Sequence, residues 1–177
     1  MPPRFISPRA IERLAVEMRE DANASSRPPV NVTRLARNFG CEVVMVDFSP
    51  DTVSARIQRH TSAAHFDYLL EVNAFDFPQR QRFSIAHELS HAVLHDDPAR
   101  DFEFIEDRKP LADYDKPDDM YKEVQANMLA AALLMPEQAV RREWARLDDI
   151  DDLADIFDTS RDSAYWRLNN LKLLVNG

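Results

Sequence analysis

The sequence predicts an α+β fold, a mainly helical domain that carries a small sheet of three strands or slightly more. Two glycines against eleven prolines are typical of helices separated by prolines. Valine-rich and aromatic runs are concentrated in one block, residues 41–72, as expected for a few neighbouring strands. With 177 residues, 45% of them apolar, the chain can bury one core, so we expect a single domain over 1–177.

The N-terminal part of this domain, 1–30, is predicted to be one helix followed by a loop. Ser7 before Pro8 is a helix-start signature, and apolar residues repeat at helical spacing to about Asp21. The segment 22–29 is small, polar and proline-bearing, which indicates a loop. Residues 31–40 then predict a short helix with Asn31 as its N-cap and Gly40 at its end.

Three strands are expected over 41–48, 53–59 and 66–72. The third run, 66–72, is a candidate edge on which an extended substrate could add as a further strand. Cys41 opens the first strand and is interpreted as a small core residue, with a thiolate ligand to zinc as the alternative.

The cellular location is predicted from what the chain lacks. A single cysteine excludes an internal disulfide and fits a reducing compartment. The chain has no apolar run near the roughly 20 residues of a membrane span, and its start lacks a signal peptide's apolar region. We therefore expect a cytoplasmic protein that does not contact a membrane.

Long helices are predicted after the strands, over 78–95, 120–135 and 137–147. A pair of helices, 150–157 and 161–174, follows in the C-terminal part of the same domain, 148–177. Between the first two helices, 96–119 holds ten acids, four bases and three prolines, so we expect a mobile or irregular acidic loop. It could be a lid, a surface that steers a basic substrate, or a solvated run.

Charge argues against direct nucleic-acid binding, because the formal net charge is −9. The C-terminal pair has the spacing of a helix-turn-helix, but seven acids against three bases have the wrong sign for gripping phosphate. We interpret this pair as packing elements or a protein-docking face. The first forty residues hold seven arginines against four acids, which leaves room for an anionic effector such as DNA.

The segment FSIAHELSHAVLH, 83–95, contains the candidate metal-binding and catalytic residues. Residues four apart on a helix lie about 40° round and about 6 Å along from each other, so His87 and His91 can bind one metal ion. Glu88 beside them can act as a base on a water that zinc activates. His95 lies about 12 Å beyond His87 on a continuous helix, too far to share the ion, and is interpreted as a helix C-terminal residue favoured by the macrodipole.

The third ligand must therefore come from another segment. The helix over 121–135 contains one glutamate, Glu123, and Asn127 one turn later could hydrogen-bond a ligating histidine. From the residues alone, Glu123 fits a ligand and a solvated acid at a helix start equally well. The oxyanion donor also stays open among four candidates, which are Tyr121, Tyr114, His65 and His60.

The combination of RQRFSIAHELSHAVLH (80–95) with EVQANMLAAALLMP (123–136) resembles the ImmA/IrrE family of zinc metallopeptidases. The resemblance covers most of the chain from about Asn31 and implies a zincin-like domain with a bound Zn²⁺. It implies His87, His91 and Glu123 as the metal ligands and Glu88 as the catalytic base. Many members have a second acid where this chain has Gln125, which favours Glu123 as the ligand.

The resemblance also implies a regulatory role. Members cut a helix-turn-helix transcriptional repressor or a related regulator encoded nearby, which switches on stress, DNA-damage, mobile-element or phage-defence genes. The alternative is a non-catalytic module that controls a repressor partner by association. A structural zinc would normally have four protein ligands, whereas three and a base are found here, so the pattern favours an enzyme.

Overall fold

The computed structural model describes residues 6–25, 27–48, 53–60, 66–97, 102–107 and 116–174. Within these residues the chain forms seven helices and four strands, which confirms the α+β prediction. The helices are α1 (Pro8–Asp21), α2 (Val32–Asn38), α3 (Pro78–His95), α4 (Pro117–Leu134), α5 (Glu137–Leu147), α6 (Ile150–Phe157) and α7 (Arg161–Asn170). The strands are β1 (Cys41–Val46), β2 (Val53–Arg59), β3 (Tyr68–Asn73) and β4 (Glu103–Asp107).

The four strands form one mixed sheet in the order β1-β3-β2-β4. β1 runs parallel to β3, whereas β2 is antiparallel to both β3 and β4. The turn into β1 depends on Gly40, which ends α2 with a φ of +81° and whose absent Cβ would lie 2.6 Å from Asp67 Oδ2. Only glycine fits both the left-handed backbone and this close approach.

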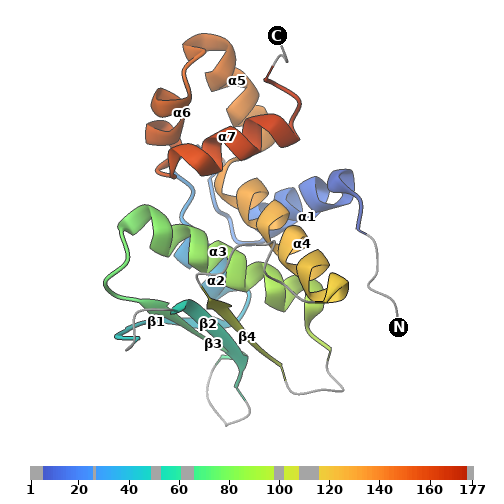
Figure 1. Cartoon of the computed structure of the whole chain (residues 1–177), viewed down its shortest axis with the longest axis vertical. Helices are drawn as coiled ribbons and strands as arrows, with labels where there is room; N and C mark the ends of the chain where they lie inside the picture. The colour runs from blue at the N-terminus through green and yellow to red at the C-terminus, as the bar shows by residue number, and fades with distance from the viewer. Residues whose placement is uncertain are drawn as a thin grey trace.

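The helices are stacked on one face of the sheet (Figure 1). α3 lies across the sheet and contacts β2, β3 and β4, while α4 crosses α3 on its other side. α1 packs on α4, and α5 to α7 form a group at the end of the molecule farthest from the sheet. No helix in the described part of the chain is long and apolar enough to span a membrane.

The middle of α3 is buried on all sides because it is covered by the sheet and by α4. Every residue from Ser84 to Ala92 is buried, including three that are charged or titratable. A helix in this position needs apolar or small residues around its whole circumference, so the polar ones require a specific reason for being there. The core around it includes Leu89, Leu129 and Leu133, all fully buried.

Two expectations about strands were wrong. The segment 96–119 is not an irregular loop throughout, because β4 and the first turn of α4 lie within it; its residues 98–101 and 108–115 are outside the described part. The acidic composition of this segment gave no strand signal. Pairing with β2 and burial of Phe102 stabilise the strand. The run 66–72 is not an edge, because β3 pairs with β1 and β2; β4 is the terminal strand next to β2.

The last helix is shorter than the predicted 161–174. α7 ends at Asn170, and Lys172 has a φ of +56°. The N–H of Leu173 donates to the carbonyl of Leu168 at 2.9 Å, which turns the chain out of the helix. A cap of this kind was not visible in the apolar pattern, which continues through Leu174.

Candidate metal centre

The crossing of α3 and α4 brings together the three side chains that the sequence predicted as metal ligands. His87 and His91 lie one turn apart on α3, and Glu123 reaches them from α4. These three residues form a group whose ligand atoms lie within 4.8 Å of one another. The group could hold a metal ion, and both histidines are almost fully buried, at 3% and 1% exposed.

The distances within this group fit a small tetrahedral ion. The two Nε2 atoms are 3.1 Å apart, and the Glu123 carboxylate lies 3.1 Å from His87 Nε2 and 3.3 Å from His91 Nε2. Ligands at about 2.0–2.1 Å from a tetrahedral zinc are separated from each other by about 3.3–3.4 Å. The two imidazoles and the carboxylate therefore lie close enough together to bind one ion.

Asn127 contacts His87, the first of the predicted ligands, as its spacing from Glu123 suggested. Its Oδ1 lies 3.0 Å from His87 Nδ1, so the ring proton is best assigned to Nδ1. That tautomer leaves the Nε2 lone pair directed at the cluster. The contact is the outer hydrogen bond that usually fixes a metal-binding histidine.

Phe104 of β4 covers the second ligand, and the sequence reasoning missed it. Its ring stacks on the His91 ring with centroids 4.1 Å apart and an interplanar angle of 19°. The Nδ1 of His91 is buried and has no hydrogen-bond partner among the described residues, so ring stacking helps to hold the orientation of this imidazole. Phe102 and Phe104, spaced as on one face of a strand, were the available signal, but they lie in the acidic segment.

Burial and hydrogen bonding set the charges of the cluster. Burial lowers the pKa of His91 to about 3, against an opposing hydrogen bond from Glu123, so the ring is neutral at pH 7. Burial alone would raise the pKa of Glu123, but its close contacts with His87 and His91 hold it well below its usual range. Neutral imidazole and ionised carboxylate are the protonation states that a metal ion requires.

Glu88 is the most deeply buried acid of this region, at 0% exposed. It follows His87 directly on α3, at the centre of the buried stretch. Burying a carboxylate is costly unless it has a partner or a chemical role. The sequence predicted that chemical role for Glu88, as the catalytic base.

The other candidates lie elsewhere. His95 donates from Nε2 to the Lys122 carbonyl, 3.1 Å away, and lies outside the metal-binding group. It is the last residue of α3, as expected, and burial lowers its pKa. Cys41 is buried at the start of β1 and is not part of the group found among the described residues. Its role as a core residue fits this position.

The proposed oxyanion donors are only partly described. Tyr121 lies on α4 and its hydroxyl accepts a hydrogen bond from Gln125 Nε2 at 3.2 Å. His60 follows β2, and its ring contacts that of Phe66 with centroids 4.6 Å apart. Tyr114 and His65 lie outside the described residues. The choice among these donors stays open.

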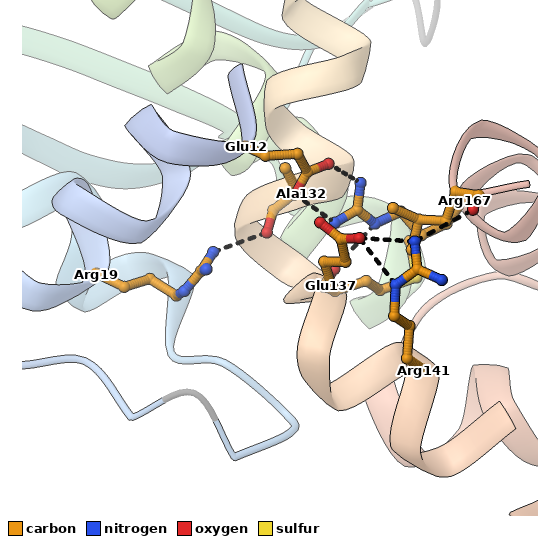
Figure 2. Close-up of polar contacts among 8 residues, drawn as sticks. Glu12, Arg19, Ala132, Glu137, Arg141 and Arg167 are labelled. Atoms are coloured by element: carbon orange, nitrogen blue, oxygen red, sulfur yellow. Dashed lines mark hydrogen bonds and ion pairs between the residues drawn. The ribbon is translucent and has the colours of Figure 1, made fainter. Parts of the chain in front are cut away.

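Two buried arginines hold the far end of α4 (Figure 2). Arg19 of α1 donates to the Ala132 carbonyl at 2.7 Å, and Arg167 of α7 donates to the Met135 carbonyl at 2.9 Å. Arg167 also forms a two-pronged ion pair with Glu12 of α1. These cations occupy the negative end of the α4 dipole and fix the helix that carries Glu123.

The fold and the cluster together define a zincin-like peptidase domain: a buried His-Glu-x-x-His helix on a small sheet, with a carboxylate supplied by the next helix. A family model described as the IrrE N-terminal-like domain of the Peptidase_M78 family matches residues 36–169. The chain therefore belongs to this family of metallopeptidases, as the resemblance indicated.

Comparison with solved structures supports the fold. A chain described as a Mycobacterium tuberculosis transcriptional regulator matches with a TM-score of 0.61 and 21% identity. The match covers 90% of this chain but 46% of that one, so the present chain spans less than half the length of the regulator. No curated protein matched the sequence.

Proposed function

We propose that the protein is a zinc metalloendopeptidase that cuts a peptide bond in a DNA-binding regulator. The observation that carries the proposal is the cluster of His87, His91 and Glu123 with a fully buried Glu88 beside it. Three protein ligands leave a coordination position for water, which is the arrangement of catalytic rather than structural zinc. Membership in a peptidase family supports the same reaction.

In this mechanism His87, His91 and Glu123 would hold the ion, and Asn127 and Phe104 keep the two rings in place. Zinc, when bound, supplies a Lewis acid that lowers the pKa of a water toward about 7. Glu88 takes a proton from the attacking water and returns it to the leaving nitrogen. The hydroxyl is added to the carbonyl carbon and the proton to the amine, so one water is consumed for each bond broken.

The edge of the sheet offers a place for the substrate backbone. β4 is the terminal strand of the sheet next to β2, and it lies beside the cluster through the contact of Phe104 with His91. An extended peptide that adds to β4 would run close to His91. This role replaces the one expected for 66–72.

The biological role rests on family membership and on charge. A cytoplasmic peptidase of net charge −9 is suited to a basic, DNA-binding partner, and one structural relative is described as a transcriptional regulator. We propose that cleavage of a repressor encoded nearby relieves repression of stress, DNA-damage, mobile-element or phage-defence genes. DNA would act, if at all, as an activating effector at the arginine-rich N-terminal part.

The test compares wild type with Glu88→Gln, each incubated with the purified regulator encoded next to the gene. Both should bind one zinc, but Glu88→Gln should lower kcat by a factor of about 10²–10⁴ because the base is lost. Glu42→Gln, an exposed acid on β1, is the matched control and should cleave like wild type. A stable complex with the regulator and no cleavage by either protein would instead establish the non-catalytic module.

A further inference from the structure

A pocket of about 820 Å³ lies next to His87, since Asn127 lines it. The proposed mechanism gives this pocket no role. It lies between α3, α4 and α7, three helices that are distant in sequence. Its volume falls in the range of about 300–1,000 Å³ typical of ligand sites. Its lining includes Phe77, Phe83, Asn127, Asp162 and Trp166.

Two residues that line the pocket also contact His87 of the metal cluster. Asn127, one of its lining residues, is the residue that bonds His87 Nδ1. Phe83, on the α3 wall, has its ring stacked on that of His87 with centroids 6.0 Å apart. A molecule in the pocket would therefore contact two residues that touch the His87 ring.

Large apolar side chains line the pocket and remain exposed. Phe77 is 82% exposed and Trp166 is 60% exposed, on opposite walls formed by the start of α3 and by α7. Exposed aromatic residues gathered around a hollow are unfavourable in water and mark a binding site. Tryptophan in particular is enriched among the residues that dominate binding energies.

A carboxylate accompanies Trp166 on the α7 wall. Asp162 lies one turn before it on the same face, is exposed, and forms no ion pair or hydrogen bond through its side chain within the described part of the chain. The opposite wall carries Arg80, whose Nε and Nη2 donate to Ser54 Oγ at 3.2 and 3.0 Å. An available acid next to an indole ring suits a lysine or arginine, through an ion pair and a cation–π contact.

We propose that this pocket is a specificity site that binds a large apolar side chain of the substrate with a lysine or arginine beside it. The inference rests on the proposed peptidase function and names the substrate feature that the enzyme reads. Trp166 and Phe77 contact the apolar side chain, and Asp162 pairs with the basic one.

Cleavage specificity provides the first test. Zinc-loaded wild type is incubated with a library of peptides derived from a digested proteome, and the cut bonds are identified by mass spectrometry. Sites should be enriched in aromatic or large aliphatic residues next to lysine or arginine. On the best-cleaved peptide, Trp166→Ala should raise KM about 10-fold and leave kcat within about twofold, because uniform binding is lost. Asp162→Lys should shift the preference toward acidic neighbours.

Matched controls separate the pocket from general effects of charge and exposed rings. Asp155→Lys makes the same charge change at an exposed position of α6 outside the pocket, and Phe75→Ala removes a ring that is 75% exposed two residues before Phe77. Both controls should keep the wild-type preference and KM. Unchanged specificity in Trp166→Ala and Asp162→Lys, with cleavage intact, would overturn the pocket assignment and leave the peptidase proposal standing.

Binding provides a test that does not depend on catalysis. Zinc-loaded Glu88→Gln is titrated with a fluorescent peptide holding one phenylalanine beside two lysines in a glycine-serine background, and with versions carrying alanine or glutamates instead. The phenylalanine-lysine peptide should bind at least about 10-fold tighter, and adding Trp166→Ala or Asp162→Lys should abolish the difference. This preference without cleavage by wild type would overturn the peptidase and retain the site; equal binding of all peptides would overturn the site.

Discussion

The contact between Asn127 and His87 is the residue-scale feature with the most direct consequence for metal binding. Asn127→Ala removes the oxygen that holds the His87 ring, and we expect the dissociation constant for zinc to rise about 10–100-fold. Competition with a chromogenic chelator measures this constant. Asn127→Asp keeps an acceptor oxygen and should bind zinc within a few fold of wild type; equal weakening by both changes would contradict an orienting role.

Cys41 leads to a second prediction at the same scale. Burial raises the pKa of its thiol to about 12, so the thiolate is almost absent at neutral pH. In native buffer Ellman's reagent should react with this cysteine only after guanidinium unfolds the chain. Rapid reaction of the folded protein at pH 8 would show that the thiol is accessible and would reopen its role as a ligand.

The same shift affects stability at high pH. The unfolded thiol ionises near pH 9 and the folded one near pH 12, so its contribution is fully present below pH 9 and is lost between pH 9 and 12. Comparison of wild type with Cys41→Ala by urea unfolding isolates this contribution. The difference in free energy of unfolding between the two proteins should stay constant below pH 9 and decline above it.

At the scale of the helix, the support of α4 depends on an ion pair with α1. Glu12→Gln leaves Arg167, which is 2% exposed, without its counter-charge, and we expect a loss of about 3 kcal/mol in the free energy of unfolding. Urea denaturation measures the change. Glu17→Gln alters an exposed acid of the same helix and should change stability by less than about 0.5 kcal/mol; similar losses in both variants would contradict the anchor.

The elements differ in how far local sequence predicted them. The boundaries of β2, α3, α5 and α6 agree with the predicted ranges, because caps, prolines and apolar periodicity are local signals. β4 was missed because its pairing with β2 and the stacking of Phe104 on His91 are contacts with distant segments. The central position of β3 likewise depends on the pairing order of the sheet, which strand propensity does not contain.

At the scale of the whole molecule, metal binding should be linked to folding. The ligands come from two helices, so only the folded chain presents the cluster. Zinc at about 100 times its dissociation constant should add about 2.7 kcal/mol to the free energy of unfolding, which is about 5–10 °C in Tm for a domain of this size. Calorimetry with and without a chelator measures the shift, and His91→Ala should abolish it. An equal shift in that variant would place the ion elsewhere.

The sequence by itself determined the local part of this site. The spacing of His87, Glu88 and His91 is converted into geometry by the pitch of a single helix, and that pitch also excluded His95. The class of fold and the ends of α3, α5 and α6 likewise followed from signals within about a turn of each residue.

Tertiary structure decided the rest, because it depends on which distant segments pack together. The position of Glu123 beside His87 and His91 depends on α4 crossing α3, where Asn127 bonds His87, forty residues away. Phe104 reaches His91 only through the pairing of β4 with β2, and the pocket exists only because α7 closes against α3 and α4. Such contacts are fixed by burial and shape across the whole chain, which no local pattern encodes.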